Sequence, residues 1–128
     1  PETRQSAMPA FDGILTPAEI AAVVGHVQSL SGKAKPNAKG AELFATNCAS
    51  CHGADGKAEV IVMHMDVPPK DQSDAIYMKT LPDAYLYLAI CRGGEGVGKN
   101  FIMPAWGDLL SDQDIKDLVA QIRTFSGT

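Results

Sequence analysis

The features that the sequence lacks set the first limits on its class. Its 128 residues contain no apolar run near the roughly 18 residues that a membrane-spanning helix requires, so we expect a soluble chain. There is no excess of basic residues, since 11 Lys and Arg stand against 15 Asp and Glu, which argues against nucleic-acid binding. Three cysteines are too few for a disulfide framework. The first residues contain neither a start Met nor the apolar core of a signal peptide, so we expect a mature or trimmed chain.

Two of the cysteines belong to a motif with a specific chemistry. Cys48, Cys51 and His52 form the pattern C-x-x-C-H, the attachment signature of c-type haem. Two thiols one helical turn apart can form thioethers with one porphyrin, and the adjacent imidazole can then bind its iron. A thioredoxin-like dithiol would need a strand-to-helix turn, whereas a helical pattern precedes Cys48. A zinc site would need a second ligand pair, and only Cys91 and His64 remain, without paired spacing. The sequence favours one covalent haem c, with zinc or dithiol chemistry as alternatives.

Helical periodicity predominates, so we expect an all-α fold. Asn37 is the expected N-cap of a helix that leads into the motif. A second helix is expected to begin at Pro82 and to end at Gly93-Gly94. Ser111 and Asp114 have the spacing of a capping box for the last helix. The apolar residues of this helix recur at helical spacing and predict a core-facing stripe: Ile115, Leu118, Val119, Ile122 and Phe125.

An iron bound by His52 needs a further ligand on the other side, unless that position is open. Met103 is the candidate, because Pro104 restricts it to extended backbone and His/Met ligation raises the reduction potential of a haem. The alternative is that Met103 only packs in the core. The second ring nitrogen of His52 needs an acceptor, for which we expect a backbone carbonyl of the loop that contains Pro68 and Pro69.

Residues 37–128 resemble a class I c-type cytochrome domain. The resemblance rests on Gly40 and Phe44 before the C-x-x-C-H motif, on Pro68-Pro69 after it, and on Met103-Pro104-Ala105-Trp106 before the last helix. It implies the all-α class I cytochrome c fold wrapped around one haem, with crossing first and last helices and with His52 and Met103 as axial ligands. The residues expected to line the haem are Phe44, Tyr85, Leu86, Phe101, Ile102, Trp106, Leu118 and Ile122.

The beginning of the chain repeats its end. Met8 to Gly32 aligns without gaps with Met103 to Gly127, at an offset of 95 residues, and eight of the 25 positions are identical. We therefore interpret residues 1–32 as the end of a preceding cytochrome c domain, with an extra N-terminal helix over about residues 16–31. The alternative is a chance repeat or a packing helix of a single domain. Met8 would then be the axial ligand of a haem outside this chain.

This repeat predicts three segments, namely residues 1–32, a Lys-rich linker over 33–39, and the cytochrome c domain over 40–128. Residues 1–32 also resemble the end of the first haem domain in the dihaem subunit of high-affinity haem–copper oxidases. Tyr85 to Gly98, in contrast, resembles free-standing monohaem cytochromes. The hypothesis is a fragment of a tandem dihaem cytochrome.

The expected function is periplasmic one-electron transfer at an exposed haem edge, without enzymatic activity. The chain would act as a carrier, or as a relay domain of a respiratory or dehydrogenase chain, and its partners would be redox proteins. The apolar helix at the N-terminus would allow self-association through residues 10–32. The alternative is a peroxidase-like haem enzyme or a gas-binding sensor with an open sixth position. That alternative requires Met103 to lie away from the iron and offers only Arg92 as a distal cation.

Overall fold

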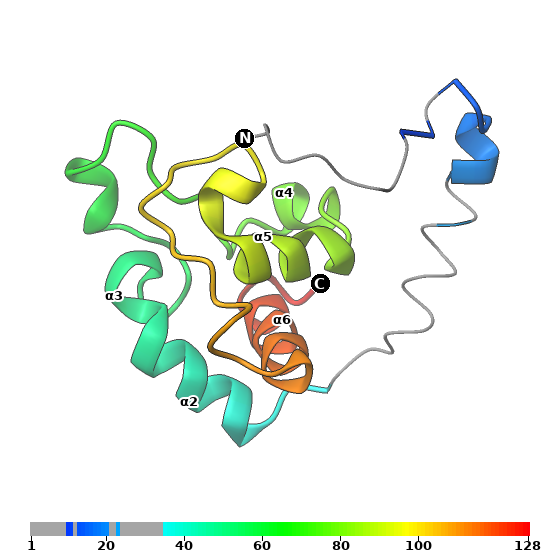
Figure 1. Ribbon diagram of the computed structural model, residues 1–128. Coiled ribbons are helices and arrows are strands. Elements are labelled where there is room, and N and C mark those ends of the chain that lie inside the picture. Colours follow the sequence, from blue (N-terminus) through cyan, green and yellow to red (C-terminus); the bar gives the residue numbers. More distant parts are fainter. Residues whose placement is uncertain (1–9, 12, 21–22, 24–34) are drawn as a thin grey trace. The chain divides into compact units, whose positions relative to one another are not determined.

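The chain divides into two compact units, residues 1–32 and 33–128. The computed structural model describes residues 10–11, 13–20, 23 and 35–128. The described part of the second unit has only helices as regular elements, which confirms the all-α prediction (Figure 1). These elements are α2 (Ala38–Asn47), α3 (Ala49–His52), the 3-10 helix η1 (Ile61–Met63), α4 (Ala75–Lys79), α5 (Asp83–Gly96) and α6 (Asp112–Ser126). Among the described residues, no helix has the length and apolar character needed to span a bilayer.

The helix starts follow from side chains that bind free backbone N–H groups. Asn37 caps α2, since its Oδ1 accepts a hydrogen bond from the N–H of Gly40 at 2.9 Å. Ser111 and Asp114 form the predicted capping box at the start of α6. The sequence predicts Pro82 in the first turn of α5, and the structure places it one residue earlier, at the N-cap before Asp83. The regular helix is interrupted at Gly93, where the sequence predicts its end, and a further turn after this kink extends α5 to Gly96.

Helices α2 and α6 pack at close range, and one glycine makes this possible. A Cβ atom at Gly40 would overlap the carbonyl oxygen of Asp117 and would lie 3.0 Å from its carbonyl carbon. The carboxylate of Asp117 is buried, with 6% exposed surface, and accepts hydrogen bonds from Asn37 Nδ2 at 3.0 Å and from Gln113 Nε2 at 2.9 Å. Asn37 therefore caps α2 and also donates a hydrogen bond to the buried Asp117 of α6. Without such partners, burying this carboxylate would be costly.

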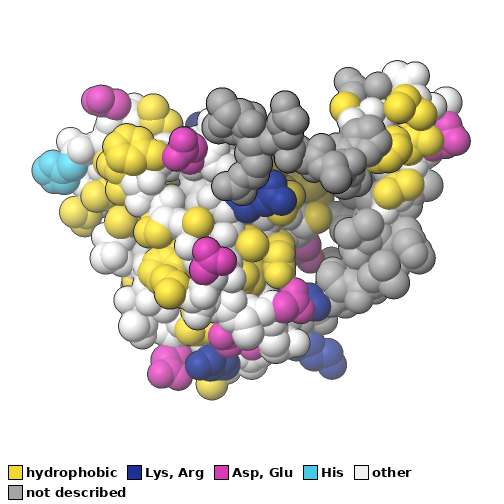
Figure 2. All heavy atoms as spheres, viewed as in Figure 1, with side chains coloured by type: hydrophobic (Ala, Val, Ile, Leu, Met, Phe, Trp, Pro, Cys, Tyr) yellow, Lys and Arg dark blue, Asp and Glu magenta, His cyan; other side chains and the backbone are white. Residues whose placement is uncertain are grey.

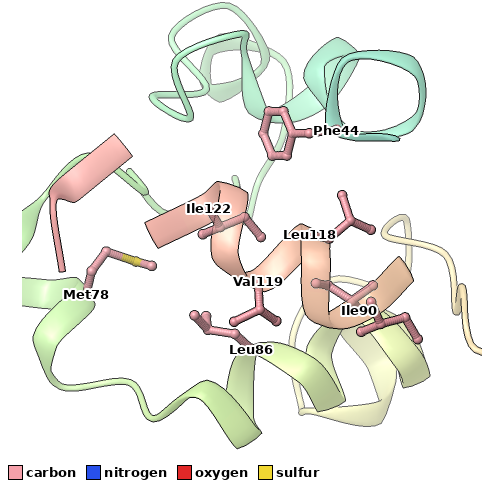
Figure 3. Close-up of a cluster of buried hydrophobic side chains, with 8 residues drawn as sticks. Phe44, Met78, Leu86, Ile90, Leu118, Val119 and Ile122 are labelled. Carbon is pink, nitrogen blue, oxygen red and sulfur yellow. The ribbon is translucent and has the colours of Figure 1, made fainter. Parts of the chain in front are cut away.

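The apolar stripe of α6 lies between α2 and α5 (Figure 3). Leu118 and Ile122 extend toward Phe44 of α2, and Val119 extends toward Leu86 of α5 (Figure 3). Burying each of these side chains is worth about 1.5–3 kcal/mol relative to exposure. The buried cluster consists of Phe44, Met78, Leu86, Ile90, Ile115, Leu118, Val119 and Ile122.

A polar contact between α5 and α6 gives stability that depends on pH. The hydroxyl of Tyr87 donates a hydrogen bond to Asp112 Oδ1 at 2.8 Å, and Lys116 Nζ lies 2.7 Å from Oδ2 of the same carboxylate. The hydrogen bond to Asp112 raises the pKa of Tyr87 to about 12. Hydrogen bonds from Lys116 and Tyr87 lower the pKa of Asp112.

We expect Tyr87→Phe to reduce the free energy of unfolding most near neutral pH. The pKa of Tyr87 is raised, so its contribution is complete below its ordinary pKa of 10.0 and is lost as the pH rises through about 12. The pKa of Asp112 is lowered, so its contribution is complete above 3.8 and is lost as the pH falls further. Urea unfolding of both proteins at acid, neutral and alkaline pH measures this, with Tyr77→Phe as the control. An equal difference at every pH would contradict the prediction.

Candidate functional site

The C-x-x-C-H residues lie on one helical turn directly after α2. The N–H groups of Cys51 and His52 both donate to the carbonyl oxygen of Cys48, at 3.2 and 2.9 Å. The two cysteines are free thiols and, like His52, are half-buried. The turn ends at Gly53, whose positive φ of 79° reverses the chain, and the N–H of Ala58 closes the loop on the carbonyl oxygen of His52 at 2.8 Å.

The thiol pKa argues against a dithiol centre, and the lack of further ligands among the described residues argues against zinc. Burial, and to a lesser extent Cys51, raises the pKa of Cys48 to about 11, whereas a dithiol oxidoreductase needs a lowered thiol pKa. Burial lowers the pKa of His52, which keeps its imidazole in the neutral form that binds metals. A zinc site would need further ligands, but no group of three or more His, Cys, Asp or Glu able to hold a metal ion occurs in the part of the chain that the structure describes.

The ring of His52 is held by a residue that the sequence analysis did not identify. Gln72 Nε2 lies 3.3 Å from His52 Nδ1, and the ring of Phe44 lies 6.5 Å away between centroids. That a carbonyl of the Pro68-Pro69 loop accepts a hydrogen bond from the His52 ring stays a prediction. In the same loop, the carbonyl oxygen of Val67 accepts a hydrogen bond from Asn100 Nδ2 at 3.2 Å. Both prolines are half-buried.

The segment that contains Met103 is attached to the C-terminal half of α5. The carbonyl oxygen of Met103 accepts a hydrogen bond from Gly94 N–H at 3.1 Å. Two further bonds follow, from Trp106 N–H to Ile90 O at 2.9 Å and from Gly107 N–H to Cys91 O at 3.0 Å. These three hydrogen bonds hold residues 103–107, called the strap below, against α5. Met103 itself is half-buried against the hydrophobic core.

The kink in α5 is what allows the strap to lie so close. Gly93 has a φ of 75°, and a Cβ atom there would lie 2.7 Å from the carbonyl oxygen of Met103 and 2.9 Å from the N–H nitrogen of Ala105. Any side chain at this position would push the strap away from the helix. Gly93 and Gly94, the predicted helix end, are therefore also the residues of α5 against which the segment of Met103 packs.

The predicted lining residues fall into two groups. Phe44, Leu86, Leu118 and Ile122 are buried in the core, and Tyr85 and Trp106 are half-buried against it. Phe101 and Ile102, by contrast, are 76% and 52% exposed. They follow Asn100, which binds the loop containing Val67. That loop also exposes large apolar side chains, namely Val60, Val62, Met63 and Val67.

These residues fit a covalently attached haem. Two free thiols and a neutral imidazole share one turn, and a thioether lies on a strapped segment. Exposed apolar side chains that gather in one patch often mark a surface that a ligand or partner covers. Here they lie on two loops joined by the Asn100–Val67 hydrogen bond, and Figure 2 shows groups of apolar side chains exposed on the visible face of the described residues.

The fold and the site together define a c-type cytochrome domain. A family model described as "Cytochrome C oxidase, cbb3-type, subunit III" matches residues 35–122, and the chain belongs to this family. It is 38% identical to the cbb3-type cytochrome c oxidase subunit FixP of Azorhizobium caulinodans, over 98% of this chain and 41% of that protein. It is 34% identical to subunit CcoP of Cereibacter sphaeroides, over 98% of this chain and 42% of that protein.

A solved structure supports the same fold. The KustC0563 c-type cytochrome superposes with a TM-score of 0.56 and 23% sequence identity, over 67% of this chain and 95% of that one. The chain spans about two fifths of the length of the curated relatives it matches. We therefore identify the chain as a cytochrome c domain of this family, a class that carries covalent haem c.

The comparisons cover nearly the whole chain. The family match spans residues 35–122 and so includes Tyr85–Gly98, the stretch that resembles free-standing monohaem cytochromes. The alignments with the curated relatives cover 98% of the chain and so also include most of residues 1–32. The predicted resemblance to the subunit of a haem–copper oxidase is confirmed.

Proposed function

We propose that this chain is a periplasmic electron-relay part of a cbb3-type oxidase subunit. One haem c would be attached through Cys48 and Cys51, with His52 and Met103 as axial ligands. The observation that carries the proposal is that Cys48, Cys51 and His52 share one helical turn, while backbone hydrogen bonds to α5 hold the segment of Met103. The periplasm follows from the cofactor, because haem is attached to such motifs outside the cytoplasm. Redox proteins, a donor and an acceptor, are the proposed partners.

In this proposal the haem supplies the change of iron oxidation state, and the chain supplies a site that does not change with it. Hydrogen bonds to α5 keep Met103 at a constant position, so little rearrangement accompanies each electron. A thioether ligand stabilises the reduced iron and raises the reduction potential. Phe101 and Ile102 would cover part of the haem and exclude water from it, and an uncovered edge would meet the partners.

The described residues of the first unit support its interpretation as the end of a preceding cytochrome c domain. Thr16 N–H donates to Glu19 Oε1 at 2.9 Å, and Glu19 N–H donates to Thr16 Oγ1 at 3.2 Å. This is a capping box, and it lies 95 residues before the capping box of Ser111 and Asp114. Residues 17–20 and 23 are helical, as the repeat predicts.

The turn before this helix is repeated as well. Leu15 N–H donates to the carbonyl oxygen of Phe11 at 2.8 Å, and Leu110 N–H donates to that of Trp106 at 2.9 Å. We infer that residues 1–32 end one cytochrome c domain, that 33–39 is a linker and that 40–128 is the second domain. Met8 and most of the helix expected over 16–31, with its proposed role in self-association, lie outside the described residues.

The intact mass and absorption spectrum of the protein, produced with haem-attachment machinery, test the proposal. We expect the mass of one haem on this chain and of two on the natural polypeptide, if the tandem arrangement holds. The oxidised spectrum should contain the weak far-red band of thioether-ligated ferric iron. A Cys48→Ala, Cys51→Ala variant should contain no covalent haem. A haem spectrum without the far-red band that shifts on adding carbon monoxide would instead support the sensor or peroxidase alternative.

A further inference from the structure

We propose that Asn100 is a positioning residue for Met103, because its side chain fastens the loop before Met103 to the loop before Pro68. This inference rests on the proposed function, in which Met103 binds the iron, and adds a role that neither the C-x-x-C-H motif nor the family match assigns. The carboxamide of Asn100 binds two segments at once. Its Oδ1 accepts a hydrogen bond from Ile102 N–H at 2.9 Å, and its Nδ2 donates one to the carbonyl oxygen of Val67 at 3.2 Å.

The loop of residues 99–103 leaves α5 and returns to it at the same residue. Lys99 N–H donates to the carbonyl oxygen of Gly94 at 2.7 Å, and Gly94 N–H donates to that of Met103 at 3.1 Å. A Cβ atom at Gly94 would overlap the carbonyl oxygen of Asn100, so the backbone of Asn100 also lies directly against the helix. Both ends of the loop are therefore fixed on α5, and the side chain of Asn100 connects this base to the loop of Val67.

The acceptor on the facing loop has a restricted position. Val67 precedes Pro68, and a residue before proline is confined to extended backbone, so the direction of its carbonyl group varies little. Pro69 follows with a second fixed φ, and both prolines are half-buried. A hydrogen bond to this carbonyl oxygen therefore ties the loop of residues 99–103 to a point that does not move with it.

Asn100 passes this restraint on to Met103. The N–H group bound by its carboxamide oxygen belongs to Ile102, the residue directly before Met103. The other side of Met103 is held by the strap. In the haem-loaded protein a thioether leaves the iron when its segment moves away, and movement on the side of Ile102 breaks the Asn100–Val67 hydrogen bond. Removing this bond shifts the opening equilibrium by the net worth of one hydrogen bond, which is about three- to tenfold.

Two substitutions of Asn100 separate the bond between the loops from the turn within one loop. Asn100→Asp keeps the shape and the acceptor for Ile102 N–H but has no donor for the carbonyl oxygen of Val67. Asn100→Ala removes both bonds and adds no charge. Added imidazole is an iron ligand, so its displacement of Met103 in the oxidised protein can be followed by the loss of the far-red band. We expect both variants to bind imidazole about three- to tenfold more tightly than the wild type.

The control is Asn47→Asp, together with Asn47→Ala. Asn47 Nδ2 donates to the carbonyl oxygen of Leu43 at 3.1 Å within α2, so these variants lose a bond of the same kind, and the first gains the same charge, away from both loops. They should bind imidazole with wild-type affinity. Amide hydrogen exchange, measured by mass spectrometry, should become faster in residues 60–67 and 99–103 of the Asn100 variants and stay unchanged there in the Asn47 variants.

The two Asn100 variants must agree for the proposal to stand. An effect of Asn100→Ala alone would assign the role to the turn at Ile102, and an effect of Asn100→Asp alone would assign it to the added charge. Either result, or wild-type imidazole affinity in both variants, would overturn the proposal. Failure of the proposed function would appear separately, as a wild-type protein without covalent haem or without the far-red band.

Discussion

Replacing Met103 with leucine is expected to abolish the far-red absorption band of the oxidised protein and to lower its reduction potential. Leucine fills a similar volume but cannot donate a lone pair to iron, so the sixth position opens. The strap is held by backbone hydrogen bonds, which the substitution leaves in place, and the stability change should stay below about 1.5 kcal/mol. Absorption spectra before and after adding carbon monoxide, with a redox titration, measure the effect. The reduced variant should bind carbon monoxide, and the wild type should not.

The matched control is Met63→Leu, which removes a thioether from the exposed loop of η1. It should retain the far-red band and the wild-type potential. If Met63→Leu lost the band and Met103→Leu kept it, the assignment of the sixth ligand would be wrong and the thioether of the η1 loop would take its place.

Replacing Gly40 with alanine is expected to destabilise the protein, although alanine is the better helix former. Helix propensity alone would stabilise α2 by about 1 kcal/mol. A Cβ atom at this position, however, overlaps the backbone carbonyl oxygen of Asp117, and no rotamer change can relieve contact with backbone. Overpacking of this kind costs about 1–3 kcal/mol, and separating α2 from α6 also weakens the core contacts of Phe44. We expect a net loss of about 2 kcal/mol in the free energy of unfolding.

Chemical unfolding of both proteins measures this difference, and Ala41→Gly is the control. Ala41 is exposed on the same helix, so its replacement reports helix propensity without contact with α6. It should destabilise by about 1 kcal/mol. If Gly40→Ala instead stabilised the protein by about the amount that Ala41→Gly destabilises it, the close approach of α2 and α6 would be contradicted.

The features that could be predicted from the sequence depend on residues within one or two helical turns of each other. The C-x-x-C-H turn is one of them, and the caps at Asn37 and Ser111 are others. The stripe of α6 was found for the same reason, since period-3.6 spacing identifies a buried face before its partner is known. The repeat at an offset of 95 residues predicted a helix over about residues 16–31, and among the described residues of that range 17–20 and 23 are helical.

The features that could not be predicted depend on which distant segments meet. Gln72 lies 20 residues after His52, and no local pattern distinguishes it from an ordinary loop glutamine. The sequence alone indicates Gly93 as a helix end. It does not indicate that the backbone of Met103 packs against Gly93, because that contact forms only when the chain folds. Burial of the Asp117 carboxylate likewise depends on Asn37, 80 residues away. The sequence by itself determined the cofactor chemistry and the helices, because both depend on neighbouring residues. The neighbour of the His52 ring and the position of Met103 were decided only by the tertiary structure, because each requires contact between segments far apart in the chain.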